Sequence, residues 1–169
     1  MRPRHPIPRI WLMTDERMGD ALWPALERLP RGAGVVFRHY RSPDRAALFE
    51  QVAKVARRRG LVLLSAGGRL PGAAGSHNAR TASGLRSRSA HHRRELVAAV
   101  RAGADVVFVS PIHPTRSHPG APALGRVGLG LIIRGCRTPV IALGGMDERA
   151  FRALKPLAVH GWAGIDAWR

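Results

Sequence analysis

Seven short runs of aliphatic and β-branched residues divide the chain at regular intervals, and most are followed by a stretch of helical character. The first three runs begin near residues 9, 35 and 61, so about 26 residues separate one start from the next. That spacing fits one strand and one helix per repeat, and such alternation predicts βαβ units in a parallel sheet. The predicted strands are 9–14, 35–40, 61–65, 85–89, 105–110, 138–143 and 161–165.

The clearest helix signal lies between the second and third predicted strands. The tripeptide Ser42–Asp44 is a start signal with proline in the first turn, and Gly60 marks the end. Leu48, Val52 and Val55 fall on one face of the helix between them. Weaker helical patterns cover 22–29, 92–102 and 147–154.

The interval 65–84 is rich in glycine, alanine and serine and carries no helical stripe. A degenerate strand around 75–78 fits there and raises the count to eight strands. An eight-unit barrel normally needs at least about 200 residues, so this chain would lack its third helix and end before its eighth. An open, doubly wound sheet needs no such shortening, and spacing alone leaves both architectures open. We expect a basic, proline-rich extension over 1–8 and a single domain over 9–169.

The composition and the lengths of the apolar runs indicate where in the cell this domain is expected. The 169 residues are 45% hydrophobic, which is typical of a folded domain. No apolar run is long enough to cross a bilayer, and the first residues lack the apolar region of a secretory signal, so we expect a cytoplasmic protein without a membrane partner. The single cysteine, Cys136, excludes an internal disulfide and is interpreted as a packing residue.

The formal net charge of +17 raises the question whether the protein binds nucleic acid. Lys54 and Lys155 are the only lysines among the 28 basic residues, and the arginines are spread along the chain. Aromatic residues, at 5%, are too few for an obvious base-stacking platform. We expect nonspecific polyanion binding at low salt and no specific nucleic-acid partner.

In either architecture, functional side chains belong at the carboxyl ends of the parallel strands. Histidines, arginines and hydroxyls gather there, which suits an anionic ligand and proton transfer near neutral pH. Gly144 and Gly145 follow one predicted strand and Ala163–Gly164 ends another, so main-chain N–H groups can approach a phosphate at both places. The histidines and the lone cysteine show no metal-binding spacing, and we predict no protein-only metal site.

The strings GADVVFVSPIHPTRSHPGAPALG, WLMTDER, TPVIALGGMD and GWAGI resemble the thiamine phosphate synthase and TenI family of TIM barrels. The resemblance covers about residues 9–168. It implies a (β/α)8 TIM barrel with a degenerate middle unit and a missing last helix.

The resemblance also implies a binding site for a thiazole phosphate. It places the phosphate at Gly144, Gly145, Ala163 and Gly164. The hydroxyls expected to contact the rest of the substrate belong to Ser89, Ser110, Thr115 and Ser117.

The synthase part of the family pattern is incomplete. Arg38 matches an arginine that grips a pyrophosphate, but Tyr40 stands where the family has lysine. The family's first magnesium aspartate falls on Ser65–Ala66, and the second has no counterpart near 75–80. The resemblance is therefore closer to the TenI branch, in which a proton moves on a thiazole carboxylate phosphate without a cofactor.

We accordingly predict a thiazole tautomerase-type activity, with His91 or His118 as the catalytic histidine and Arg38 holding the carboxylate. One alternative is a divergent thiamine phosphate synthase, which would need Mg²⁺ and would join hydroxymethylpyrimidine diphosphate to thiazole phosphate. Another is a non-catalytic phosphometabolite-binding or regulatory protein. Because the missing helix leaves a sheet face uncovered, we also expect a homodimer.

Overall fold

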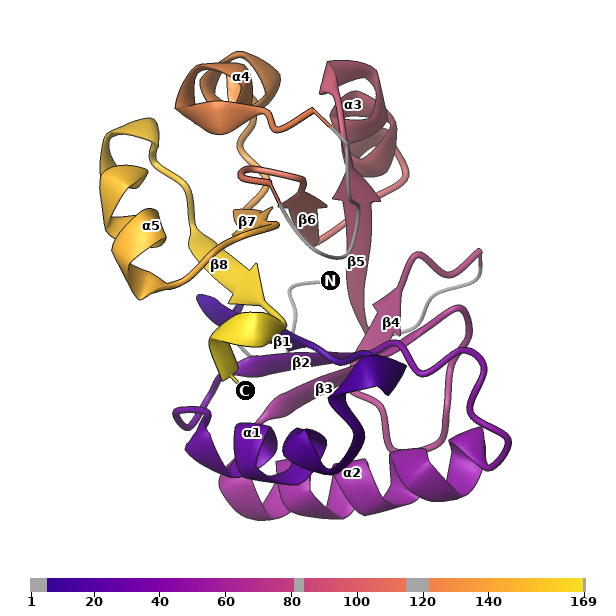
Figure 1. Cartoon of the computed structure of the whole chain (residues 1–169). Coiled ribbons are helices and arrows are strands. Elements are labelled where there is room, and N and C mark those ends of the chain that lie inside the picture. The colour runs from indigo at the N-terminus through magenta and orange to yellow at the C-terminus, as the bar shows by residue number, and fades with distance from the viewer. Residues whose placement is uncertain (1–5, 81–83, 115–121, 169) are drawn as a thin grey trace.

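The computed structural model describes residues 6–80, 84–114 and 122–168, and it contains a closed barrel of eight parallel strands (Figure 1). The strands follow chain order around the barrel, and β8 pairs with β1 through Leu12 and Gly164. The (β/α)8 prediction is therefore confirmed and the open-sheet alternative is wrong. The strands are β1 Ile10–Met13, β2 Gly34–Phe37, β3 Val62–Ala66, β4 Gly75–His77, β5 Leu85–Ala90, β6 Val106–Val109, β7 Val140–Leu143 and β8 Gly161–Gly164.

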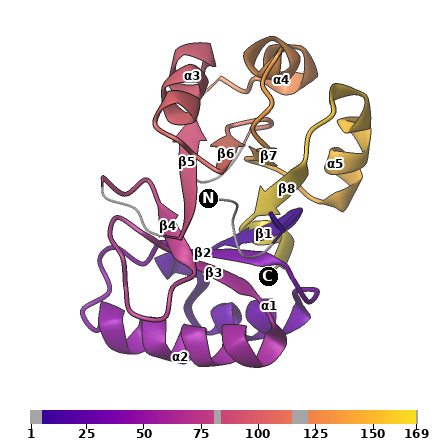
Figure 2. The same ribbon diagram turned by 180° about the vertical axis from the view of Figure 1, so that it is seen from behind.

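Helices cover the barrel unevenly. In Figures 1 and 2, α1 and α2 lie outside β1–β3, whereas α3, α4 and α5 lie outside β5–β8 on the other side of the barrel. The bounds are η1 Glu16–Ala21, α1 Leu22–Arg28, α2 Arg45–Arg59, α3 Arg93–Arg101, α4 Gly125–Ile133, α5 Glu148–Ala153, η2 Lys155–Leu157 and η3 Asp166–Trp168, where η marks a 3₁₀ helix.

Most helix predictions agree with these bounds, with two differences. Helix α2 ends at Gly60 in the left-handed conformation, as predicted, but Asp44 precedes its first residue, so the helix begins later than the Ser42 signal indicated. Helix α4 was not predicted, because its sequence GRVGLGLII has three glycines that break the helical stripe. Packing of its buried residues Leu129 and Ile132 against the barrel overrides that weak local preference.

The predicted degenerate middle unit is present. Strand β4 has only three residues, and a Cβ at Gly75 would overlap the carbonyl oxygen of Leu85 on β5. Within the described residues, no helix joins β3 to β4 or β4 to β5. Instead, the loop after β3 places Leu70 and Ala73 against the hydrophobic core. The expected homodimer stays a prediction, although this loop already covers part of the face that suggested it.

After β8, the described chain continues as the short 3₁₀ helix η3. The Trp168 ring of η3 stacks on Trp162 of β8, with centroids 5.3 Å apart and planes at 3°. Its indole N–H donates to the Trp11 carbonyl at 3.3 Å. The stacked indoles and this hydrogen bond therefore hold η3 against β8 and β1.

Large apolar side chains fill the barrel interior. Trp11 on β1 and Phe108 on β6 are both fully buried and meet edge to face at 5.2 Å between centroids. A Cβ at Gly34 would overlap the Trp11 ring, so glycine at that position makes room for the indole. On the outer side of β2, Phe37 packs against Phe49 of α2. The described helices include none long and apolar enough to span a membrane.

Candidate functional site

The carboxyl ends of the eight strands form one rim of the barrel, and Arg38 is the first polar side chain there after β2. Its main-chain N–H donates to the Thr14 hydroxyl at 3.0 Å, and its Nε–H donates to the Thr14 carbonyl at 3.0 Å. Its terminal Nη2 lies 3.4 Å from the Asp15 carboxylate. Because two of its five N–H groups are engaged in these contacts, the guanidinium is oriented while other donors stay available for a ligand.

Charge at this corner of the rim is balanced by Asp15. A bidentate contact from Arg17, with distances of 2.7 and 3.0 Å, holds the pKa of the Asp15 carboxyl at about 2 despite its partial burial. Burial lowers the pKa of the Arg38 guanidinium, but a guanidinium remains charged near neutral pH. Arg38 therefore presents a fixed positive charge that is only partly neutralised.

His39 lies beside Arg38 but on the outer side of the strand. It is 5% exposed, and its ring stacks on Phe37 at 4.9 Å between centroids. The Thr14 hydroxyl accepts from the Arg38 N–H and shares a second hydrogen bond, of 2.9 Å, with Nδ1 of His39. Burial lowers the pKa of this imidazole. His39 therefore holds Thr14 in place rather than facing a ligand.

His77, the last residue of β4, lies inside the barrel and was not among the predicted site residues. It is 3% exposed and meets Phe108 edge to face at 5.4 Å. Its Nδ1 lies 2.9 Å from the Ser87 hydroxyl, and its Nε2 lies 3.2 Å from the Ser89 hydroxyl. Burial, followed by the charges of Arg38 and Arg88, lowers its pKa to about 3. The imidazole is therefore neutral at physiological pH.

Asn78 completes this network with the left-handed φ of +54° that asparagine tolerates. Its Oδ1 accepts from the Ser89 N–H at 2.9 Å, and its Nδ2 donates to the Ser89 hydroxyl at 3.2 Å and to Nε2 of His77 at 3.1 Å. Nε2 of His77 is thus an acceptor, and Nδ1 carries the proton given to Ser87. Ser89, a predicted substrate-binding residue, is oriented by His77 and Asn78.

A sequence signal for this network existed. The segment LRSRS of β5 alternates serine with arginine, so Ser87 and Ser89 share one face of the strand. His77 pairs in register with Ser87. Strand 75–77 has too few residues to show the alternation of inward and outward positions that would place His77 inside the barrel.

His91 and Ser110 come together between the ends of β5 and β6. Nδ1 of His91 lies 2.8 Å from the Ser110 carbonyl oxygen, which can only accept, so Nδ1 carries the proton. Nε2 is therefore the ring nitrogen that could accept a proton, and no described residue hydrogen-bonds to that atom. The Glu95 carboxylate accepts the His91 main-chain N–H at 2.6 Å. His91 is exposed and oriented, as a general base must be.

The two glycine-bearing turns lie side by side at the rim. Gly144 and Gly145 have φ of +94° and +61°, and a Cβ at Gly144 would lie 2.8 Å from Cα of Pro111. A Cβ at Gly164 would lie 3.1 Å from the carbonyl oxygen of Met146 in the neighbouring turn. Glycine therefore permits close contact between loops here, in addition to the proposed approach of an anion.

The predicted phosphate residues differ in accessibility. Gly145 is exposed, Gly144 is half-buried, and Ala163 is fully buried with its side chain in the core. Ala163 can therefore contribute only through its main chain. Three further predicted residues, Thr115, Ser117 and His118, lie outside the described residues.

The residues that the structure describes do not fit a magnesium site. The described chain has no group of three histidine, cysteine, aspartate or glutamate residues placed to hold a metal ion. At the end of β3, the Ser65 hydroxyl donates to the Gly68 carbonyl and accepts from the Leu70 N–H. At the end of β1, the Asp15 carboxylate is held by Arg17 and Arg38.

Comparison with known proteins supports one family. The family model for thiamine monophosphate synthase matches residues 78–168. A thiamine-phosphate synthase of Salinispora tropica is 39% identical over 72 residues, which are 42% of this chain and 35% of that protein. One of Geobacillus thermodenitrificans is 37% identical over 81 residues, or 47% of this chain and 37% of that protein. The matched segments thus span little more than a third of these curated relatives.

Solved structures agree on the fold. A thiamine phosphate pyrophosphorylase from Pyrococcus furiosus has a TM-score of 0.75 at 19% identity, covering 94% of this chain and 86% of that one. A native KDPGal structure has a TM-score of 0.62 at 11% identity, covering 98% and 85%. The family model covers more than half of the chain, and the chain therefore belongs to the thiamine monophosphate synthase family.

Proposed function

We propose that this protein binds a thiazole phosphate and moves a proton on its ring, as a thiazole tautomerase does. The observation that carries this proposal is the pairing of an oriented, exposed imidazole with a partly free guanidinium on one rim. His91 has its proton fixed on Nδ1 by the Ser110 carbonyl, and Arg38 is anchored through Thr14. Neither residue needs a metal ion to act.

In this mechanism, main-chain N–H groups at Gly145 and its neighbouring turn hold the phosphate, and Arg38 binds the ring carboxylate with its remaining donors. Nε2 of His91 removes a proton from a ring carbon. The electron pair of the broken C–H bond moves into the π-system conjugated with the carboxylate, where the Arg38 charge stabilises it.

The same Nε2 then returns the proton to the exocyclic carbon, and the ring becomes aromatic. Nδ1 is occupied by the Ser110 carbonyl, so a relay in which one nitrogen donates while the other accepts does not fit. Ser89, oriented by Asn78 and His77, provides a hydroxyl beside the reacting ring. No proton is gained or lost overall, and no cofactor is required.

The test is conversion of a non-aromatic thiazole carboxylate phosphate to its aromatic isomer, followed by ultraviolet absorbance and by proton exchange in D₂O. His91→Gln should lower kcat by about a hundredfold or more, the usual contribution of a positioned acid or base. His160→Gln, which changes a histidine at the opposite end of the barrel, is the matched control. Wild-type turnover by His91→Gln would contradict the assigned base.

A divergent thiamine phosphate synthase is the second candidate, and the identity to proteins named thiamine-phosphate synthase favours it. Incubation with hydroxymethylpyrimidine diphosphate, thiazole phosphate and Mg²⁺ distinguishes the two activities. Formation of thiamine phosphate would support the synthase and would mean that Arg38 and other rim cations compensate for the absent carboxylates. Binding of thiazole phosphate by calorimetry, without either reaction, would indicate a non-catalytic binding protein.

A further inference from the structure

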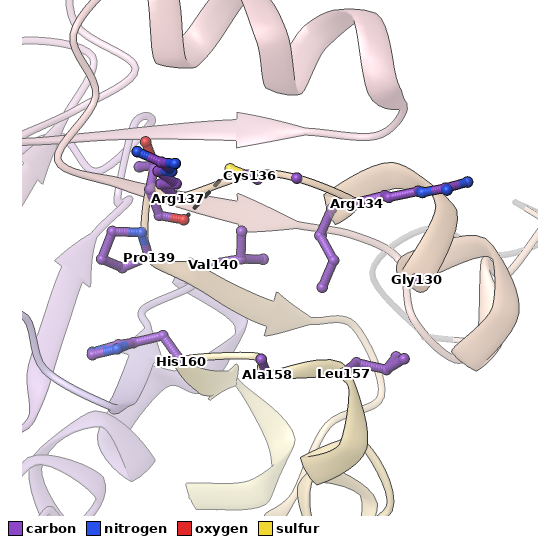
Figure 3. Close-up of a pocket in the computed structure, with 12 residues that line it drawn as sticks. Gly130, Arg134, Cys136, Arg137, Pro139, Val140, Leu157, Ala158 and His160 are labelled. Atoms are coloured by element: carbon purple, nitrogen blue, oxygen red, sulfur yellow. Dashed lines mark hydrogen bonds between the residues drawn. The ribbon is translucent and has the colours of Figure 1, made fainter.

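A cavity, which we call the lower cavity, opens at the amino ends of β7 and β8, opposite the rim that carries the candidate site. Its volume is about 420 Å³, which lies within the range of small-molecule sites. The walls come from the end of α4, the loop 134–139 and the segment 157–160 before β8. Figure 3 shows Pro139 and Val140 on one side of this lower cavity, with Leu157, Ala158 and His160 on the other.

The walls of the lower cavity combine apolar and cationic side chains. Ile133, Val140 and Leu157 supply apolar surface. Arg134 and Arg137 also line the cavity, and Figure 3 shows their side chains on opposite sides of it, pointing away from each other. The residues that line the cavity include no aspartate or glutamate. Across the described chain, neither of these two guanidinium groups has a hydrogen bond or ion pair with another residue. Their charges are therefore available to a ligand.

The carbonyl end of α4, which would ordinarily repel an anion, is already covered. Nη1 of Arg93 donates to the Ile132 carbonyl at 2.7 Å and to the Arg134 carbonyl at 2.6 Å. These contacts satisfy the last carbonyls of the helix and offset the negative end of its dipole. Three arginines, Arg93, Arg134 and Arg137, therefore lie at or beside this end of α4.

The loop after α4 adds neutral donors. Gly135 has φ of +71°, and the Cys136 N–H closes a turn onto the Ile133 carbonyl at 2.8 Å. Among the described residues, no partner engages the main-chain N–H of Arg137 or Thr138, or the Thr138 hydroxyl. Successive unpaired N–H groups beside a left-handed glycine form the kind of concavity that binds anions.

We propose that the lower cavity binds a phosphate monoester of a small apolar alcohol. The apolar body would lie on Ile133, Val140 and Leu157, and the phosphate would accept from the loop amides and from Arg137 beside them. Arg134, on the other side of the cavity, would add positive charge without direct contact. A phosphate has more acceptor oxygens than a carboxylate, which suits this number of separate donors.

Cys136 provides a reporter specific to this site, since it lines the cavity and is the only cysteine of the chain. The test measures the rate of Cys136 alkylation by iodoacetamide with increasing 1-naphthyl phosphate. We expect saturable protection, with about tenfold or more weaker protection by neutral 1-naphthol, because the charge-assisted hydrogen bonds are then missing. Inorganic phosphate, which lacks the apolar body, should also protect less.

The double variant Arg134→Gln/Arg137→Gln should weaken protection by 1-naphthyl phosphate about tenfold or more. The double variant Arg94→Gln/Arg126→Gln lowers the net charge equally but changes exposed residues outside the cavity. In this variant, 1-naphthyl phosphate should protect Cys136 as well as it does in wild type. Arg38→Gln, which disturbs the rim site, should also leave the protection intact. A failure of the proposed function and a failure of this proposal are thereby distinguished.

Amide chemical shifts give an independent measurement if a variant folds poorly. In wild-type protein, 1-naphthyl phosphate should shift the N–H resonances of Gly135, Arg137 and Thr138. Equal protection by 1-naphthol and 1-naphthyl phosphate would overturn the proposal. So would unchanged amide shifts at saturating probe, or protection that survives loss of both Arg134 and Arg137.

Discussion

The buried imidazole of His77 makes the stability of the barrel depend on pH. Its pKa is about 3 in the folded protein and 6.5 in a solvated chain, so the unfolded state binds more protons between these values. The free energy of unfolding should therefore be highest, as far as His77 is concerned, above pH 6.5, and should fall as the pH is lowered from 6.5 towards 3. For these two pKa values, His77 alone accounts for a loss of about 2 kcal/mol between pH 7 and pH 5.

The assay is urea unfolding, followed by tryptophan fluorescence and far-ultraviolet circular dichroism at several pH values from 8 to 5. His77→Gln removes the titrating ring, so its unfolding free energy should decline by about 2 kcal/mol less than that of wild type between pH 7 and pH 5. At pH 8 the variant should itself be less stable by about 1–3 kcal/mol, because the buried Ser87 hydroxyl loses a partner.

Ser76→Ala is the matched control on the same strand. Ser76 is 1% exposed, and its hydroxyl has no hydrogen-bond partner among the described residues. Its replacement should leave the pH dependence unchanged and the stability equal or slightly higher. If wild type and His77→Gln lose stability in parallel on acidification, the burial of a neutral His77 is refuted.

Three further changes test the fold and the rim. Gly34→Ala places a methyl group on the Trp11 ring, and the overpacking should lower stability by about 1–3 kcal/mol in urea unfolding. Trp168→Ala removes the ring that covers Trp162, and should lower stability by about 3 kcal/mol and enhance quenching of Trp162 fluorescence by acrylamide. Gly145→Ala has φ of +61° and a Cβ 2.9 Å from the Pro114 carbonyl oxygen, so calorimetry should show thiazole phosphate binding weakened by about tenfold or more. Wild-type affinity in Gly145→Ala would argue against a phosphate at that turn.

The strands of this barrel could be predicted from the sequence because each is a compact apolar run bounded by polar or glycine-rich segments. Even the three-residue β4 lies within the range 75–78 expected for it. Closure of the sheet could not be derived from spacing, since closure depends on the pairing of β1 with β8, which lie at the two ends of the chain. The family resemblance decided that point.

The candidate site was predictable where side chains follow strands in sequence, as Arg38 and His91 do. The roles of individual atoms were not, because they depend on contacts between distant residues. The proton position on His91 follows from the Ser110 carbonyl, and the orientation of Ser89 follows from Asn78 and His77. Helix α4 was missed because tertiary packing, rather than local preference, stabilises it.

A loop, rather than a helix, connects β3 to β4, so this part of the barrel wall has little packing on its outer side. Leu70 and Ala73 bring far less apolar area to the outside of the sheet than the fifteen-residue α2 does. Strand β4 is also the shortest of the eight strands, with three residues. Local opening should therefore begin here, and amide hydrogens of β4 should exchange with solvent before those of β1 and β2. Because β4 carries His77, local opening of this strand would also release the hydrogen bond that orients the Ser89 hydroxyl.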